Sequence, residues 1–248
     1  MNIILLGSGN VATYLGRRLR NRGHQILQVL SPRSPEGLAA ELGAEATREQ
    51  LRTDADLYIL ATSDAAIRGI AETLRLPDAL VVHTAGAVPM EVLAKISRRY
   101  GVLYPLQSLR KEVENPQPFP FLVDGSDENV KATLAELVDA PVRFCTDQER
   151  LLYHLGGVFV NNFPNYLYTL TEAWLREHGQ DFSLLLPLMA ETARRLGDFS
   201  PGEVQTGPAL RGDQATLAAH RVLLTNHPEL LTWYDLFSVA IARHFSPK

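Results

Sequence analysis

The first residues of the chain that could do chemistry are glycines with a spacing suited to binding phosphate. Gly7, Gly9 and Ala12 occupy the small positions of a G-x-G-x-x-G/A pattern. In this pattern the first glycine makes a tight turn, the second lets the backbone approach a pyrophosphate, and the last small residue lets a helix lie against a sheet. The free N–H groups of that helix favour the same phosphates. The pattern predicts a dinucleotide site formed by Gly7, Ser8, Gly9, Asn10 and Val11, and the alternative is a glycine turn that binds nothing.

A second group of polar residues follows the next expected strand, about 20 residues after the glycines, where an acid of an NAD site would bind the ribose 2′-hydroxyl. The chain has Leu30-Ser31-Pro32-Arg33-Ser34 at this point and no acid. Hydroxyl groups beside a guanidinium suit a 2′-phosphate, because Arg forms charge-assisted bonds to phosphate. The residues predict NADP(H) over NAD(H), bound by Ser31, Arg33 and Ser34, and the alternative is a solvated turn.

Small or polar residues also follow three later strands, at the ends where parallel sheets bind their ligands. These segments are Ala61-Thr62-Ser63-Asp64, His83-Thr84-Ala85-Gly86 and Tyr104-Pro105-Leu106-Gln107-Ser108. We expect Thr62, Ser63, His83 and Thr84 to contact the cofactor and Gln107 to contact the substrate. Asp64 is equally suited to capping the helix that follows.

A parallel sheet is needed to bring these residues to one edge, and the first 148 residues have the pattern of one. Short apolar runs alternate with helical segments, as in strands buried on both faces. The expected strands cover residues 2–6, 24–30, 57–61, 79–83, 101–106, 121–124 and 142–145, and the clearest helices cover 10–21 and 128–138. The sequence predicts an α/β fold with a Rossmann-like, doubly wound, mainly parallel sheet of roughly seven or eight strands.

Strand signals disappear near residue 150. Helical patterns cover residues 149–178, 182–196, 213–226 and 228–244, and Pro164 should kink or interrupt the first of them. We therefore expect two domains. Residues 1–148 form the NADP-binding Rossmann-like domain, and residues 149–248 form an all-α helical domain for substrate binding and dimerisation.

The composition disfavours several other classes of protein. The 248 residues hold 28 acidic and 24 basic side chains and one cysteine, Cys145, so neither a disulfide scaffold nor a metal site is indicated. The net charge of −4 gives no footprint for nucleic acid. The apolar run at residues 3–6 is too short for a signal peptide, and no stretch suits a membrane span. We expect a soluble, cytoplasmic protein that binds no nucleic acid and no membrane.

Four segments resemble a known family. They are Gly7-Ser8-Gly9-Asn10-Val11-Ala12, Val82-His83-Thr84-Ala85-Gly86, Val102-Leu103-Tyr104-Pro105-Leu106-Gln107 and Thr206-Gly207-Pro208-Ala209-Leu210-Arg211-Gly212-Asp213. Over essentially its whole length the chain resembles bacterial NADP-dependent oxidoreductases that join a Rossmann-like domain to a helical domain of unknown function. More distantly it is similar to pyrroline-5-carboxylate reductase, the deazaflavin-dependent NADP reductases and the 6-phosphogluconate and hydroxyisobutyrate dehydrogenases. The resemblance implies an NADP(H) cofactor and a homodimer formed through the helical domain, and it names no substrate.

The first long helix departs from these relatives at a catalytic position. Hydroxyacid dehydrogenases of this superfamily carry a catalytic Lys shortly before an Asn, whereas this chain keeps Asn161 and Asn162 and has no lysine between residues 153 and 162. His154 can hold or release a proton near neutrality, and it stands two helical turns before the asparagines. We expect His154, Asn161 and Asn162 to be catalytic. The alternatives are a histidine satisfied at a helix interface, and asparagines that orient substrate, bind the cofactor carboxamide or link helices.

A polar loop at residues 206–213 carries a second set of candidates. An Arg beside a cofactor site commonly holds a carboxylate or phosphate, so Thr206 and Arg211 are candidate substrate contacts. The alternative is ordinary turn chemistry at Gly207 and Pro208, with Asp213 capping the next helix.

Two classes of function remain. The first is an NADP(H)-dependent oxidoreductase that transfers hydride between the nicotinamide and a small carbonyl or imine compound held between the domains, with deazaflavin as another acceptor. The second is a non-catalytic NADP-binding regulatory or sensor dimer, which the missing lysine keeps open. Methyl transfer from S-adenosylmethionine is disfavoured by the NADP-type strand end.

Overall fold

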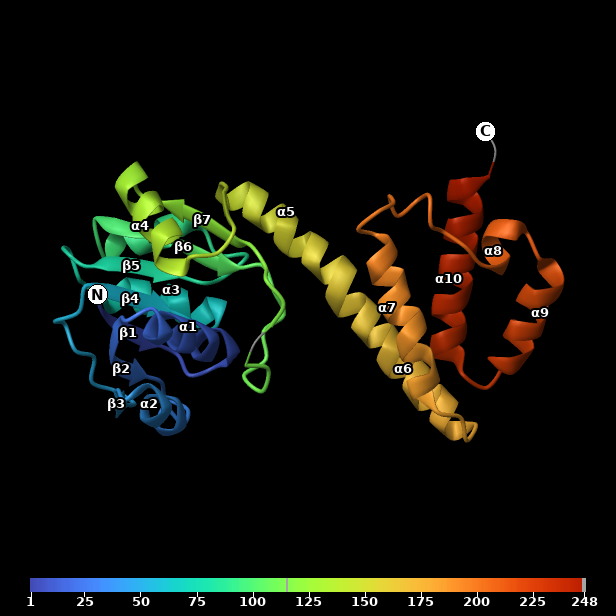
Figure 1. Cartoon of the computed structure of the whole chain (residues 1–248), viewed down its shortest axis with the longest axis horizontal. Coiled ribbons are helices and arrows are strands. Elements are labelled where there is room, and N and C mark those ends of the chain that lie inside the picture. The colour runs from blue at the N-terminus through green and yellow to red at the C-terminus, as the bar shows by residue number, and fades with distance from the viewer. Residues whose placement is uncertain (115, 247–248) are drawn as a thin grey trace. The chain divides into compact units, whose positions relative to one another are not determined.

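The structure is a computed structural model that describes residues 1–114 and 116–246. The chain forms two compact units, Met1–Phe163 and Pro164–Lys248. Figure 1 shows a sheet flanked by helices in the first unit and helices in the second. The division expected at residue 148 falls near the start of a long helical segment that runs through the boundary between the units. As a domain boundary it stays a prediction.

Eight strands form the sheet of the first unit. Their bounds are β1 Asn2–Leu6, β2 Gln25–Leu30, β3 Glu45–Thr47, β4 Leu57–Leu60, β5 Leu80–His83, β6 Arg99–Pro105, β7 Phe121–Gly125 and β8 Val142–Phe144. They lie in the order β3-β2-β1-β4-β5-β6-β7-β8, and all neighbours are parallel except β6 and β7. Strands β1, β2 and β3 follow one another toward one edge of the sheet, and β4 then pairs with the other side of β1. Ligands of parallel sheets bind at the point where the strand order changes direction in this way. The predicted α/β fold is confirmed.

The two faces of the sheet bury alternate residues of each strand, because successive side chains point to opposite sides. Ile3 and Leu5 pack in a cluster with helices α1 (Asn10–Asn21), α2 (Glu36–Leu42) and α4 (Glu128–Val138). Ile4 and Leu6 pack in a second cluster with α3 (Asp64–Thr73) and a 3-10 helix at Met90–Lys95. Each fully buried aliphatic side chain contributes roughly 1.5–3 kcal/mol. The sheet is therefore a well-supported platform for the turns at its edge.

One helical segment spans residues 147–177. It begins with α5 (Asp147–Gly157), where Thr146 and Glu149 form a capping box, continues through a π-helical turn (Val158–Asn162), and ends with α6 (Phe163–Glu177). The π turn ends two residues before Pro164, whose ring lacks an N–H and crowds the preceding turn. The interruption predicted at this proline is therefore a local widening of the helix, and it carries Asn161 and Asn162.

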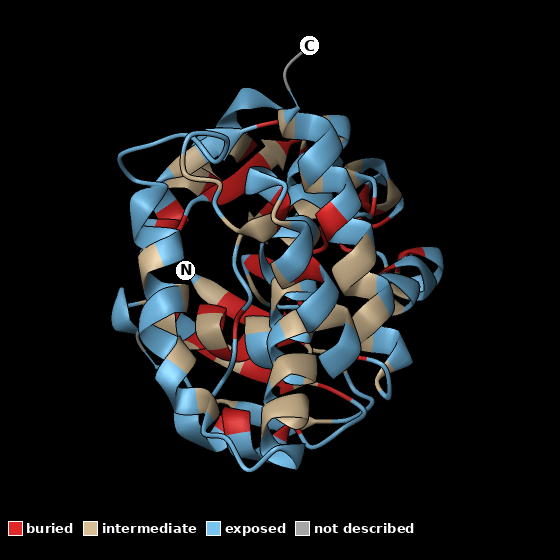
Figure 2. Ribbon diagram, turned by 90° about the vertical axis from the view of Figure 1, so that its right-hand side faces the viewer, coloured by how far each residue is buried: buried red, intermediate tan, exposed pale blue. Residues whose placement is uncertain are grey.

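The second unit continues with four further helices and a 3-10 turn. Their bounds are Phe182–Leu185 for the turn, α7 Leu186–Arg195, α8 Pro208–Arg211, α9 Gln214–Leu223 and α10 Pro228–Phe245. Among its described residues, only Ala209, Leu217, Leu224 and Ser238 are buried, and Figure 2 shows exposed and half-buried colours along most helical turns. No helix in the described part of the chain is long and apolar enough to cross a membrane.

Candidate functional site

The turn between β1 and α1 has both close packing and an open face. Gly7 has a φ of +127°, and a Cβ atom there would lie 2.2 Å from the carbonyl oxygen of Ala61, so glycine is required. Gly9 is exposed, and a Cβ atom added there would meet nothing within 4 Å beyond its two chain neighbours. No side chain caps the N-terminus of α1. Asn10 is also exposed, while Val11 packs against the core. The backbone of the turn is thus accessible to an anion at the end of a helix.

The residues that follow β2 meet this turn. Ser8 Oγ donates to the carbonyl of Arg33 at 2.7 Å and lies 3.0 Å from Ser31 Oγ. Ser31 is buried and accepts a hydrogen bond from the Arg33 backbone N–H at 3.3 Å. Arg33 and Ser34 are exposed, and the Arg33 guanidinium has no hydrogen bond or ion pair with the rest of the described chain. Ser31 therefore shapes the turn, and Arg33 is free to bind a ligand.

The ends of β1, β4 and β5 lie side by side, since Leu6 pairs with Leu60 and Leu60 pairs with His83. This register brings Thr62 and Thr84 to the same edge as Gly7. Thr84 is 7% exposed, and its backbone N–H donates to the carbonyl of Leu60 at 3.3 Å. The predicted strand-end residues are thus assembled along one edge of the sheet.

Ser63 has a local structural role at this edge. It caps α3 by accepting a hydrogen bond from the N–H of Ala66 at 3.4 Å. The sequence suggested Asp64 as the cap of this helix, but the cap is Ser63, and Asp64 is the first residue of the helix.

His83 supports the edge from within the fold. Its side chain has no exposed surface, and its Nδ1 accepts a hydrogen bond from the N–H of Ala85 at 3.2 Å. Burial, and then the positive charge of Arg150, lower the pKa of His83 from 6.5 to about 4. The neutral ring holds the turn at residues 83–86. The contact with a cofactor predicted for His83 does not fit a residue that the fold buries completely.

Acidification should destabilise the fold through His83. The unfolded residue binds a proton near pH 6.5 whereas the folded residue resists protonation down to about 4, so stability present above pH 6.5 is lost as the pH falls through this window. The shift corresponds to up to about 3 kcal/mol. Between pH 7 and pH 4.5 the free energy of unfolding, measured with urea, should fall less in His83→Gln than in wild type. The glutamine keeps an acceptor for the Ala85 N–H and cannot titrate. Equal losses in the two proteins would exclude this role.

A cavity of about 470 Å³ opens beside the end of β6. The structure brings four of the predicted site residues to its wall: Gln107, His154, Asn161 and Asn162. The other lining residues are mainly small, apolar or aromatic: Tyr104, Leu106, Ser108, Tyr153, Gly156, Gly157 and Val160. Gln107 accepts a hydrogen bond from the Ser108 N–H at 2.8 Å. The cavity combines an apolar wall with amide and hydroxyl groups, as small-molecule sites commonly do.

Two groups that carry protons meet in this cavity. The hydroxyl of Tyr104, on β6, lies 3.0 Å from Nδ1 of His154, on α5, and the two rings pack edge to face. Burial raises the pKa of Tyr104, an effect that the charge of Arg150 opposes. A Cβ atom on Gly86 would lie 2.6 Å from Nδ1 of His154. The sequence pointed to His154 and not to Tyr104, because the pair is separated by 50 residues and only the fold joins it.

Two charged residues fasten α5 to the segment that follows β5. Both carboxylate oxygens of Asp147 accept hydrogen bonds from the Met90 N–H, at 3.1 and 3.0 Å. Arg150 is 1% exposed, donates to the carbonyl of Val88 at 2.5 Å, and pairs with Asp147 at 2.8 Å. These contacts hold the helix that carries His154 against the strand-end turn that carries Gly86.

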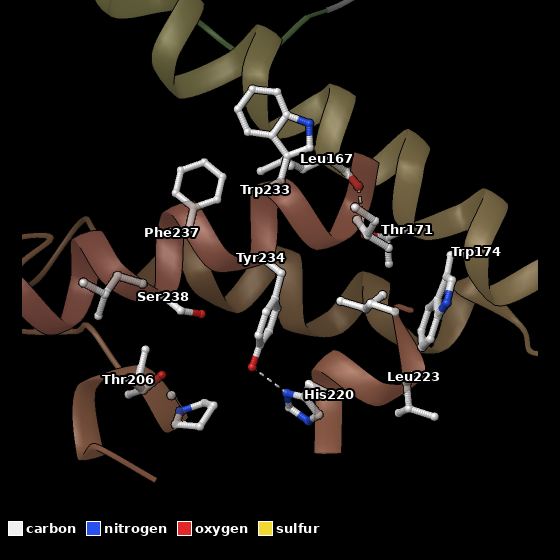
Figure 3. A pocket seen from close by; sticks show the side chains of 16 residues that line it. Leu167, Thr171, Trp174, Thr206, His220, Leu223, Trp233, Tyr234, Phe237 and Ser238 are labelled. Atoms are coloured by element: carbon white, nitrogen blue, oxygen red, sulfur yellow. Dashed lines mark hydrogen bonds between the residues drawn. The ribbon is translucent and has the colours of Figure 1, made fainter. Parts of the chain in front are cut away.

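The loop predicted at residues 206–213 lies in the second unit. Asp213 caps α9 by accepting from the Thr216 N–H at 3.1 Å, which agrees with the capping alternative. Arg211 is exposed at the end of α8. Thr206 lines a separate, largely apolar cavity of about 520 Å³ within this unit, where Figure 3 shows Tyr234 and His220 directed toward one another. The Tyr234 hydroxyl lies 2.9 Å from Nδ1 of His220. No cluster of metal-ligating residues is found among the residues described.

Two families match parts of the chain. Residues 2–86 match the coenzyme F420-dependent NADP oxidoreductases, and residues 119–241 match a domain of unknown function, DUF2520. No curated protein matches the chain.

Solved structures match over nearly the whole chain. A protein of Bacteroides fragilis, assigned provisionally as an NADP oxidoreductase, is 34% identical with a TM-score of 0.91, and the match covers 98% of each chain. The 1-pyrroline-5-carboxylate reductase of Streptococcus pyogenes is 14% identical with a TM-score of 0.62, over 98% of each chain. An imine reductase from a Pseudomonas species is 18% identical with a TM-score of 0.59, over 96% of this chain and 94% of the other. The last two share the fold.

Proposed function

Because this chain belongs to the NADP oxidoreductases that join an F420-dependent-type domain to DUF2520, we propose that it transfers hydride between NADP(H) and a small carbonyl or imine compound. The observation that carries the proposal is the Tyr104–His154 pair, which brings a proton-bearing hydroxyl and an imidazole together in a cavity beside the carboxyl edge of the sheet. Hydride addition to a carbonyl or imine carbon needs such a proton source at the neighbouring oxygen or nitrogen.

The residues of the edge fit NADP(H). The open Gly9 backbone and the uncapped N-terminus of α1 suit the pyrophosphate, and the free Arg33 guanidinium with Ser34 suits the 2′-phosphate. When bound, the cofactor supplies or accepts the hydride. Ser8 and Ser31 hold the Arg33 turn, and Thr62 and Thr84 border the same edge, where the nicotinamide end is expected.

The cavity residues divide the remaining work. Tyr104 and His154 hold the proton that the substrate oxygen or nitrogen receives as its carbon is reduced. Gln107, Asn161 and Asn162 present amide groups that can orient the substrate.

We retain Thr206 and Arg211 as substrate contacts, and Arg211→Ala should then raise the KM for the substrate without lowering the affinity for NADPH.

Consumption of NADPH tests the function directly. We expect the purified protein to bind NADPH and to oxidise it, followed by absorbance of the reduced nicotinamide, with at least one member of a panel of uncharged and carboxylated aldehydes, ketones and cyclic imines. A deazaflavin acceptor is included in the panel. Tight binding without turnover on any acceptor would contradict hydride transfer and favour a regulatory, NADP-binding role.

Gly86→Ala should disconnect the proton pair while leaving the cofactor turn at Gly7 intact. Because the added methyl carbon would lie 2.6 Å from His154 Nδ1, the His154 ring and the Gly86 turn cannot both keep their positions, and the contact of the ring with Tyr104 should be disturbed. We expect turnover to fall about tenfold or more, the effect of losing roughly 1.4 kcal/mol of transition-state stabilisation. Gly69→Ala, where the new carbon meets nothing within 4 Å beyond its chain neighbours and the backbone of its own helix, is the matched control. Unchanged turnover in Gly86→Ala would show that the His154 position does not matter.

We also propose that the chain acts as a homodimer through its helical unit. That unit buries few residues by itself, and it exposes large apolar side chains such as Leu184 (77%) and Leu188 (66%). Monomeric proteins rarely leave such surfaces uncovered.

We also propose that the protein is cytoplasmic, because a free, buried thiol such as Cys145 stays reduced there.

Light scattering after size-exclusion chromatography tests the dimer. Leu188→Glu should weaken association at least tenfold, because an unpaired charge is placed on the covered surface. Val113→Glu, at a side chain 50% exposed in the first unit, is the control. A monomeric wild-type protein, or Leu188→Glu dimerising as strongly as wild type, would contradict the proposal.

A further inference from the structure

Arg150 is the largest side chain in the described chain that is fully buried, and the proposed reaction gives it no role so far. One of its nitrogens, Nη2, donates to the carbonyl of Val88 at 2.5 Å and lies 2.8 Å from Asp147 Oδ1. Its Nε and Nη1 atoms are also buried and have no hydrogen-bond partner among the described residues. A buried guanidinium that is only partly paired is costly to keep.

The position of this charge relates it to the proton pair. Arg150 and His154 are four residues apart on α5 and therefore share a helix face. His154 in turn lies 3.0 Å from the Tyr104 hydroxyl. The titratable and charged groups around the centre are His83 on β5, Tyr104 on β6, Cys145 just before α5, and Asp147, Arg150 and His154 on α5, and the charge of Arg68 on α3 also acts on His83. Asp147 is partly exposed whereas Arg150 is not, so water screens the carboxylate more than the guanidinium.

We propose that Arg150 is a positioning residue whose buried positive charge stabilises the phenolate of Tyr104, so that Tyr104 is the immediate proton donor and His154 restores its proton. The inference rests on the proposed function. As hydride reaches the substrate carbon, the electron pair of the C=O or C=N bond moves to oxygen or nitrogen. That atom takes the proton of Tyr104, the O–H bond breaks, and the phenolate remains near Arg150 until His154 returns a proton drawn from solvent.

The direction of the effect of Arg150 on Tyr104 agrees with this role. Burial raises the pKa of Tyr104 and Arg150 is the charge that opposes the rise. The clamp of Asp147 and Arg150 on residues 88–90 adds a geometric contribution, because it holds His154 next to Gly86.

Ionisation of Tyr104 tests the proposal without any substrate. The protein contains eight tyrosines, and their carbon-13-labelled Cζ atoms can be titrated by NMR, with Tyr104 assigned from the signal missing in Tyr104→Phe. We expect Arg150→Met to move the Tyr104 midpoint to higher pH and Arg150→Lys to restore most of the shift. Asp147→Asn should move the midpoint to lower pH, because the remaining positive charge loses its partner. Arg143→Met, which removes an exposed charge stacked 5.2 Å from the Tyr153 ring, should leave it unchanged.

Activity supplies the second readout. With the best acceptor of the NADPH panel, Arg150→Met should lower kcat about tenfold or more while the KM for NADPH changes less than about twofold. Arg150→Lys should recover part of kcat because the lysine keeps the positive charge, and the Tyr104 midpoint of the same variant shows whether that charge still acts on Tyr104.

Failure of this inference can be told apart from failure of the proposed function. An unchanged Tyr104 midpoint in both Arg150→Met and Asp147→Asn overturns the role of Arg150, even if NADPH is consumed. If no acceptor is reduced, the function fails while the titration still measures the coupling. Should Arg150→Met not fold, Asp147→Asn and Arg150→Lys decide the outcome.

Discussion

Replacing Tyr104 with phenylalanine is expected to lower kcat about 10²- to 10⁴-fold, the range that loss of a positioned acid–base group usually costs. The change deletes only the hydroxyl that lies 3.0 Å from His154 Nδ1 and preserves the ring that packs against it. The Kd for NADPH should change little, because Tyr104 lies in the substrate cavity. Single-turnover oxidation of bound NADPH separates the two effects.

Tyr100→Phe is the matched control for this prediction. Tyr100 lies on the same strand, and its hydroxyl donates to Glu91 at 3.0 Å, away from the cavity residues. We expect a large loss for Tyr104→Phe and near wild-type turnover for Tyr100→Phe. Similar kcat values for wild type and Tyr104→Phe would remove Tyr104 from the reaction.

Arg33→Ala is expected to reduce the preference for NADPH over NADH roughly ten- to a hundredfold. Hydrogen bonds to charged groups contribute about 1.5–3 kcal/mol, and the Arg33 guanidinium has no partner in the described chain that competes with the 2′-phosphate. The affinity for NADH should stay nearly constant, because its ribose has no 2′-phosphate. Titrating both cofactors into both proteins gives the ratio.

Arg48→Ala controls for the loss of a nearby positive charge. Arg48 is exposed and pairs with Glu36 at 2.9 Å, so its removal should leave the cofactor preference unaltered. Equal NADPH-to-NADH ratios in wild type and Arg33→Ala would mean that another group binds the 2′-phosphate.

Much of the fold follows from local patterns in the sequence. Helices α1 and α4 have the bounds expected from sequence, because apolar periodicity and good end residues agree there. The sequence did not predict the short edge strand β3, Glu45–Thr47, because its three residues, Glu, Ala and Thr, show no alternation of apolar and polar side chains. They pair as a strand because β2 lies beside them.

The candidate site shows a sharper division. The glycine turn could be predicted because its chemistry lies within six consecutive residues. His83 looked like a ligand residue because it is polar at a strand end, yet the fold buries it. The sequence did not single out Arg150, and it presented Tyr104 only as part of a strand end. Their roles depend on contacts between α5, β5 and β6, which local sequence does not encode.

The proposed reaction is tested most directly by a crystal structure of the protein with NADP⁺ bound. We predict that the 2′-phosphate contacts Arg33, that the pyrophosphate lies over Gly9, and that C4 of the nicotinamide opens onto the cavity lined by Tyr104, Gln107 and His154. A nicotinamide ring directed away from that cavity, or a cofactor bound elsewhere on the chain, would contradict the proposed reaction.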